Sequence, residues 1–347
     1  MKPKVKRHYF MYDYKKRGKQ IKFLMGSSPK NRFEFEGNEI IIDILNKCDG
    51  SKDIELIAEE LSLISEFDKN DLLETIEDLM NKNILFDATQ RDIDKTSRYS
   101  RQQSFLSSLG VDEHLMLEQI QNRTILLIGM GGIGCWVLAN LASCGIKKFV
   151  GIDNDVLEIS NLSRQIIYQE RDLGKYKVDL AKKWVSNYNS DLEFINIKAR
   201  INSTEDVLGY LDSLDSIDMV VLSADSPSCM LSYVHNACKK KNIPYIQAGY
   251  IDEVGSCGPL VTDFSTNVAL TVPNEEKAEK STQEKIDNIN SQQITPVLCP
   301  VVALVSSYAS KQIIKYFLGC KDIKVLNKRI YFNFDDTETI FEFKKEE

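Results

Sequence analysis

The sequence feature that most constrains the fold is a glycine-rich turn directly after a short apolar run. Residues 124–128 read TILLI, which is typical of a buried strand. Four glycines follow this run: Gly129, Gly131, Gly132 and Gly134. Such a turn lets backbone N–H groups approach a phosphate, and the N-terminus of the next helix adds a partial positive charge. A second apolar run ends at Asp153, where a carboxylate can bind ribose hydroxyls. Residues 124–164 therefore predict a nucleotide-binding unit.

Composition restricts the classes to which the chain can belong. Its 347 residues suffice for two domains, and a hydrophobic content of 43% supports a sizeable core. The net charge of −7 argues against a nucleic-acid partner. No run reaches the roughly 18 apolar residues of a membrane span, and the basic N-terminus lacks the apolar core of a signal peptide. Cysteines without a C-x-x-C pair fit reduced thiols. We expect a cytoplasmic protein with neither a nucleic-acid nor a membrane partner.

The first 95 residues differ in character from the rest of the chain. Three β-like runs come first: residues 8–12, 20–25 and 32–36. Three helical stretches follow: residues 39–47, 52–63 and 70–81. Ser51 and Asp68 are the expected caps of the second and third helices, and residues 84–86 can close the unit as a wing strand. The pattern predicts a small winged-helix-like α+β module.

Residues 87–99 are polar and suit a linker, so the predicted domains are 1–95 and 96–347. Beyond the glycine turn, helix-like and strand-like segments alternate, which predicts a mostly parallel sheet in a Rossmann-like α/β fold. Residues 263–295 are polar and charged, as expected of a mobile crossover loop. A buried helix is expected once past Pro300, and two alternating strands close the chain.

Cations and carboxylates gather in the sequence around the glycine turn. The turn alone would fit any dinucleotide-binding dehydrogenase. The charged and polar residues near it are Arg101, Asp153, Asp155, Asn161, Arg164, Gln165, Lys177 and Asp225. Hydride transfer places no charge on phosphate, whereas attack of a carboxylate on the α-phosphate of ATP builds negative charge that Arg, Lys and Mg²⁺ stabilise. The pattern therefore favours nucleotidyl transfer, with Asp225 as the Mg²⁺ ligand.

A family resemblance is carried by five motifs: RYSRQ, GMGGIG, DNDVLEISNLSRQ, GKYK and LSAD. Over residues 98–335 the chain resembles the ThiF/MoeB ubiquitin-activating-like adenylating superfamily. Within it, the run from VLSAD to CGPL is most similar to the microcin C-type peptide adenylyltransferase (MccB) group. The N-terminal module resembles the PqqD-like domain, which holds a precursor peptide as an added β-strand. A dimerisation or packing appendage is the alternative for that module.

The resemblance implies a role for each motif residue. Catalytic roles are implied for Arg101, Arg164, Lys177 and Asp225. Nucleotide-binding roles are implied for Gly129, Gly131, Gly132, Gly134, Asp153, Asp155, Asn161 and Gln165. Asp155 and Lys175 would lie behind the residues that contact the nucleotide and support them. Arg101 would reach into the active site of the partner subunit, so a homodimer is implied.

Two departures from the family pattern bear on the chemistry. Relatives usually carry two C-x-x-C pairs for a structural zinc, and the corresponding segments here contain no cysteine, so we expect zinc to be absent. No cysteine lies between residues 258 and 298, where related enzymes form a thioester. Cys257 and Cys299 flank that segment and are expected to be small core residues.

The function expected from these features is ATP- and Mg²⁺-dependent adenylation of a short ribosomal precursor peptide at its C-terminal carboxylate, as in microcin C-type maturation. Activation of Glu or Asp side-chain carboxylates for dehydrative cyclisation is the nearest alternative. Two others stay open: a sulfur-carrier activator, and a non-catalytic leader-peptide-binding partner that has kept the fold.

Overall fold

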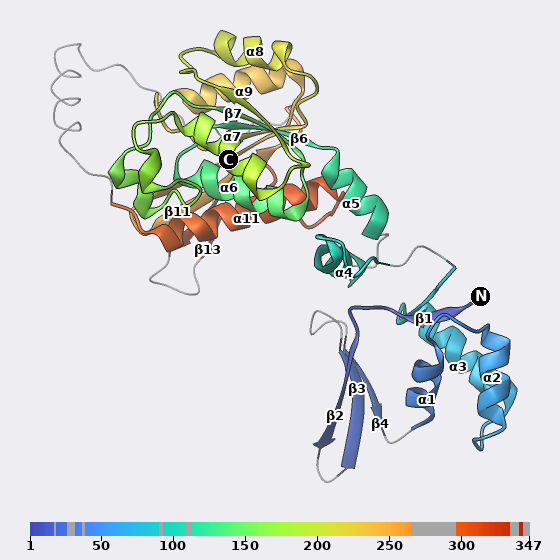
Figure 1. The fold of residues 1–347 in the computed structure, drawn as a ribbon. Helices are drawn as coiled ribbons and strands as arrows, with labels where there is room; N and C mark the ends of the chain where they lie inside the picture. The colour runs from blue at the N-terminus through green and yellow to red at the C-terminus, as the bar shows by residue number, and fades with distance from the viewer. Residues whose placement is uncertain are drawn as a thin grey trace, which may run out of the picture. The chain divides into compact units, whose positions relative to one another are not determined.

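The computed structural model describes residues 1–16, 19–25, 32–36, 39–89, 93–108, 113–264, 296–333 and 340–342. The chain divides into two compact units, Met1–Leu117 and Glu118–Glu347, which Figure 1 colours from blue to red along the sequence. The predicted crossover loop at 263–295 lies outside the described residues, apart from Asp263 and Phe264.

Two small sheets form in the first unit. The predicted ribbon is confirmed: β2 (Phe10–Lys16), β3 (Lys19–Met25) and β4 (Arg32–Glu36) pair antiparallel in that order. The predicted wing strand, β5 (Leu85–Asp87), does not join the ribbon. It pairs antiparallel with β1 (Pro3–Val5), a strand too short to leave an alternating pattern in the sequence.

The three predicted helices of the first unit are α1 (Ile40–Lys47), α2 (Ile54–Ser62) and α3 (Lys69–Asn81). Their apolar faces form one core that includes Ile44, Ile57 and Ile76. Asp68 caps α3 as expected, since its carboxylate accepts two backbone N–H bonds. The N-cap of α2 is Asp53, so the expectation for Ser51 was wrong. The expected helical region up to residue 121 forms two helices, α4 (Ser100–Ser108) and α5 (Glu113–Gln121).

The second unit is built on a twisted sheet with the order β13-β12-β11-β10-β9-β6-β7-β8 among the described residues. Its parallel part consists of β6 (Thr124–Ile128), β7 (Lys148–Ile152), β8 (Glu193–Ile197), β9 (Met219–Leu222) and β10 (Tyr245–Ile251). The antiparallel part consists of β11 (Val254–Val261), β12 (Ile330–Asn333) and β13 (Ile340–Glu342). The expected α/β fold with a mostly parallel, Rossmann-like sheet is therefore confirmed.

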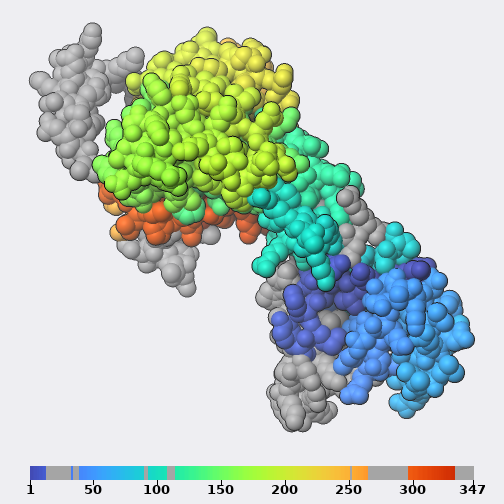
Figure 2. Space-filling model, viewed as in Figure 1, coloured from blue at the N-terminus to red at the C-terminus, as the bar shows by residue number. Residues whose placement is uncertain are grey.

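Helices cover both faces of this sheet (Figure 1). On one face, α8 (Thr204–Ser213) and α9 (Met230–Lys241) bury apolar residues against alternate strand positions such as Leu126 and Val150. On the other face, α6 (Gly132–Cys144) packs on α11 (Cys299–Phe317), and α7 (Lys177–Tyr188) packs near β8. Figure 2 shows α8 and α9 in yellow on the surface of this unit, with α11 in orange-red on the opposite side.

Two details of the helices complete the description. Pro300 lies in the first turn of α11, which begins at Cys299, so the expected start beyond Pro300 was two residues late. Proline is well tolerated there because the first N–H groups of a helix have no partner within it. Among the helices formed by described residues, none has the length and apolar character needed to cross a membrane.

Strand order fixes the place of the site. The chain adds β7 on one side of β6 and later returns to add β9 on the other side. At such a switch point the loops leaving the strands diverge and open a crevice at their carboxyl ends. The glycine turn after β6 lies in this crevice, facing the loop that follows β9.

Candidate nucleotide-binding site

The glycine turn is packed so closely that side chains are excluded from parts of it. Gly129 has a φ of 98°, and a Cβ there would lie 2.9 Å from the backbone nitrogen of Ala224. A Cβ on Gly134 would lie 2.1 Å from the carbonyl oxygen of Gly129, because α6 begins directly against the turn. Gly131 is the N-cap of α6, and a Cβ there would lie 3.8 Å from the Nε2 of Gln165, an ordinary contact distance. The turn therefore presents the N-terminus of a 13-residue helix to the crevice.

Asp153 follows β7 and is held by the glycine turn itself. Its carboxylate accepts the backbone N–H of Met130 at 2.6 Å and that of Asp155 at 2.7 Å. Burial raises the pKa of Asp153, since desolvation outweighs these two hydrogen bonds and the nearby Lys177 ammonium. Asp153, which is predicted to bind ribose, is thus held in place beside the glycine turn.

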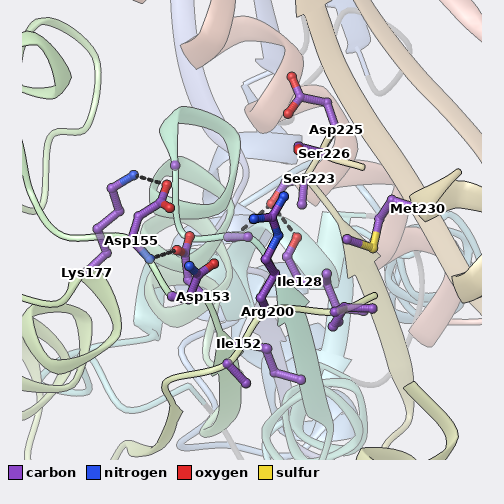
Figure 3. A pocket seen from close by; sticks show the side chains of 16 residues that line it. Ile128, Ile152, Asp153, Asp155, Lys177, Arg200, Ser223, Asp225, Ser226 and Met230 are labelled. Carbon is purple, nitrogen blue, oxygen red and sulfur yellow. Dashed lines mark hydrogen bonds and ion pairs between the residues drawn. The ribbon is translucent and has the colours of Figure 1, made fainter. Parts of the chain in front are cut away.

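A cavity of about 300 Å³ opens beside Asp153 (Figure 3). Much of its lining is apolar: Ile128, Ile152, Ala199, Ile201 and Met230. Apolar walls beside a carboxylate suit a nucleoside, with the base against the walls and the ribose at Asp153. Arg200 also lines this cavity, a residue that sequence reasoning missed. It follows β8 by a few residues, in a loop that carries no nucleotide-binding motif.

A second cavity of about 620 Å³ adjoins the first and is more polar. Lys177 lines both cavities, and its side chain is only 7% exposed although it is a cation. Its ammonium pairs with the carboxylate of Asp155 at 2.8 Å, and Asp155 is itself 60% exposed. A buried ammonium with one exposed counter-ion has N–H groups left for an anionic ligand.

Arg164 lies on the wall of the larger cavity and is fixed from two sides. Its Nε donates to the hydroxyl of Tyr250 at 3.2 Å, and its Nη1 donates to the carbonyl of Ser160 at 3.1 Å. The backbone carbonyl of Arg164 accepts the indole N–H of Trp136 at 3.2 Å. These contacts hold the guanidinium in place before any ligand binds.

Asn161 and Gln165 lie on the same wall and are buried. Asn161 accepts the backbone N–H of Glu158 at 3.2 Å, so its oxygen already stabilises the short helix Ile159–Ser163. Gln165 is 2% exposed, and its Oε1 has no hydrogen-bond partner among the residues that the structure describes. A buried amide with an unpaired atom beside a phosphate-binding turn fits a site that is completed by a ligand or water.

Asp225 follows β9 and lines both cavities as an exposed carboxylate. It does not cap α9, whose N-cap is Cys229. Ser223, two residues earlier, donates to the carbonyls of Ile128 at 3.1 Å and Gly129 at 2.9 Å, which ties the loop after β9 to the glycine turn. Asp225 is therefore placed opposite Lys177 across the nucleotide site, as Figure 3 shows.

The other predicted residues lie elsewhere. Arg101 is exposed on α4 in the first unit, and Lys175 pairs with Asp172 at 2.8 Å without lining either cavity. Cys257 is fully buried, and burial raises the pKa of its thiol to about 12, which disfavours the thiolate needed by a nucleophile. Cys299 starts α11 and is partly exposed. In the described part of the chain, no group of three or more His, Cys, Asp or Glu side chains could hold a metal.

Residues near the end of β10 were also missed. Gln247, Ala248, Gly249 and Tyr250 line the larger cavity. The sequence carries a signal for them, because β10 is parallel to β9 and its carboxyl end must open onto the same edge of the sheet as Asp225.

Fold and site together define a Rossmann-like α/β protein with a glycine-rich turn that can receive a nucleotide. The chain belongs to the ThiF family, whose model matches residues 99–347. Among solved structures it is similar to E. coli MccB with MccA-N7isoASN, at 25% identity and a TM-score of 0.79 over 99% of this chain and 96% of that one. E. coli MccB with ATP, at 24% identity and a TM-score of 0.77 over the same shares, has the same fold.

Two curated relatives are named as a subunit of an activating enzyme and as an adenylyltransferase. The chain is 34% identical over 161 residues to SUMO-activating enzyme subunit 2 of Dictyostelium discoideum, covering 46% of this chain and 24% of the relative. It is 27% identical over 213 residues to the adenylyltransferase and sulfurtransferase MOCS3 of Anopheles gambiae, covering 61% of this chain and 46% of the relative. The chain therefore spans less than half the length of these relatives.

Proposed function

We propose that the enzyme adenylates a carboxylate of a short ribosomally synthesised peptide, with the C-terminal carboxylate as the reacting group. One observation carries the proposal. Around the glycine turn, the buried Lys177, the fixed Arg164 and the exposed Asp225 line one continuous pair of cavities. Transfer of a nucleotidyl group needs this concentration of charge beside phosphate, whereas hydride transfer does not.

Each of these residues has a defined part in the proposed reaction. Asp153 binds the ribose of ATP, and the N-terminus of α6 faces the phosphates. The peptide carboxylate attacks the α-phosphorus, and the bond to the departing pyrophosphate breaks. Lys177 and Arg164 stabilise the charge that accumulates on the phosphate oxygens. Asp225 would hold Mg²⁺ together with substrate phosphate, and that ion would supply further charge stabilisation.

The proposed peptide-binding part is the N-terminal module, residues 1–95. Its strand β2 is at the edge of the three-stranded sheet, and Phe10, Met11 and Tyr12 are 60%, 41% and 46% exposed. An edge strand with exposed large side chains supports docking of an extended peptide by strand addition. The similarity to MccB, which has been solved in complex with N-formylated MccA, supports the same assignment.

Pyrophosphate exchange tests the function. Purified enzyme should incorporate labelled pyrophosphate into ATP only when given the correct peptide, and synthetic peptides from the short open reading frames beside the gene are the candidates. Asp225→Ala should lower this exchange about 10²-fold, because Mg²⁺ contributes several kcal/mol to the transition state. Asp212→Ala is the matched control, since Asp212 is an exposed carboxylate on α8 that lines neither cavity.

Mass analysis of the product separates the leading alternatives. A peptide that gains a nucleotide mass supports adenylation as the completed reaction. A peptide that loses water instead identifies dehydrative cyclisation through a side-chain carboxylate. Absence of exchange with every candidate peptide, combined with normal behaviour of Asp225→Ala in cells, would leave the non-catalytic binding partner as the better assignment.

A subunit-mixing experiment tests the proposed homodimer with Arg101 acting across its interface. Arg101→Ala and Lys177→Met should each be nearly inactive alone. In mixed dimers, one of the two sites would receive an intact Arg101 and an intact Lys177, so random pairing should restore about a quarter of wild-type activity. If Arg101 acted within its own subunit, mixing would restore nothing, and full activity of Arg101→Ala alone would remove it from the mechanism.

A further inference from the structure

Gln247 has a side chain whose direction is determined by an arginine outside the cavity. The backbone of Gln247 pairs with Leu222 of β9, and Gln247 is one of the residues that line the larger cavity. Arg329, just before β12, donates from Nη2 to the Oε1 of Gln247 and from Nε to the carbonyl of Gly258 at 3.0 Å. Arg329 is thereby anchored to the sheet and does not itself line either cavity.

This contact decides which end of the Gln247 amide is bound to Arg329 and which end is left for another partner. A guanidinium carries only donors, so the atom that faces Arg329 must be the amide oxygen. The amide nitrogen then points away from Arg329. Within the described part of the chain this nitrogen has no hydrogen-bond partner, and it is not among the fully buried polar atoms. Its two N–H donors are therefore not used by any described group, in a residue that lines the larger cavity.

The chemistry of acyl adenylation calls for a donor of this kind. When a carboxylate attacks phosphorus, one oxygen forms the new bond and the other becomes the carbonyl oxygen of the mixed anhydride. A cation beside that second oxygen would bind the carboxylate tightly and weaken it as a nucleophile. A neutral amide N–H orients the oxygen at a smaller cost in nucleophilicity. The cations Lys177 and Arg164 remain for the phosphates.

We propose that Gln247, oriented by Arg329, binds the acyl oxygen of the activated substrate. This assignment rests on the proposed adenylation of a carboxylate. It makes Gln247 a substrate-contacting residue and Arg329 a positioning residue. The ligand group it selects is a carboxyl or carbonyl oxygen next to the reacting centre.

The test uses the full-length protein and a stable analogue, 5′-O-(alanylsulfamoyl)adenosine, with AMP as the reference ligand. Calorimetry gives the Kd of each ligand. The Kd of AMP divided by the Kd of the analogue measures how much affinity the acyl part adds. The wild type should bind the analogue more tightly than AMP. Gln247→Met should reduce this ratio about fivefold, the value of one neutral hydrogen bond, and leave the Kd of AMP unchanged. Gln247→Glu should reduce it more, because a carboxylate oxygen would face the acyl oxygen while the contact to Arg329 is kept.

A matched control and two opposing outcomes complete the test. Gln169→Met, at an exposed glutamine of the same unit that lines neither cavity, should keep the wild-type ratio. If both Gln247 variants keep that ratio, the assignment of Gln247 is wrong and the proposed function is unaffected. If the wild type itself binds the analogue no more tightly than AMP, the proposed carboxylate adenylation is wrong, and the role of Gln247 is overturned with it.

Discussion

Replacing Lys177 with methionine is expected to lower peptide-dependent pyrophosphate exchange about 10²- to 10³-fold, the usual cost of removing one preorganised charge-stabilising group. The Lys177 side chain is 7% exposed, so its ammonium acts in a partly desolvated environment where it interacts strongly with phosphate. Methionine keeps the length and most of the volume of the side chain. The main loss is therefore the positive charge.

The effect of Lys177→Met should appear in activity much more than in folding. Its counter-ion Asp155 is 60% exposed and can be solvated by water once the partner is gone. Lys183→Met is the matched control, because Lys183 is on the same helix, pairs with Asp172 and lines neither cavity. Exchange rates of Lys177→Met close to those of the control variant would show that Lys177 has no part in the reaction.

Replacing Gly134 with alanine is expected to destabilise the second unit by about 3 kcal/mol or more, because overpacking against backbone leaves little room to relax. The added Cβ would lie 2.1 Å from the carbonyl oxygen of Gly129, so α6 or the glycine turn has to move. Either movement would displace the N–H groups that face the phosphates. Nucleotide affinity should therefore fall together with the free energy of unfolding.

Gly209→Ala is the control for this prediction, with an expected effect of opposite sign. Gly209 is exposed in the middle of α8, and a Cβ there would meet no atom within 4 Å. Alanine favours a helix by about 1 kcal/mol over glycine, so this variant should be slightly stabilised. Urea unfolding of both variants measures the two effects. A Gly134→Ala midpoint equal to that of the wild type would contradict the close packing of α6 on the turn.

The glycine turn could be predicted from sequence because its chemistry is local. Strand β6, the glycine turn and the first residues of α6 follow one another in the sequence. Each of these segments requires residues of a recognisable type. The same holds for the cap at Asp68 and for the alternating strands of the N-terminal ribbon. Predictions failed where a distant segment decided the outcome: the wing strand β5 pairs with β1, which lies at the other end of the module.

The cation-rich wall of the site illustrates a second limit. The motifs predicted that Arg164 and Lys177 belong near the nucleotide, and both line the larger cavity. The motif could not predict that Tyr250 holds the Arg164 guanidinium from a strand 86 residues away. Residues of this kind leave no periodic or spacing signal, since their role depends on which strands are neighbours in the sheet.

The sequence by itself predicted a nucleotide-binding turn after β6, and its charged motifs indicated transfer chemistry in place of hydride transfer. These conclusions depend on residue types within one continuous stretch. Only the tertiary structure decided which residues lie opposite the glycine turn. The order β10-β9-β6 brings Gln247 and Asp225 to one edge of the sheet, and β12 brings Arg329 behind Gln247. The reason is physical. Strand pairing brings Arg329 and Gln247 together although they are 82 positions apart in the sequence, and no local pattern encodes that pairing.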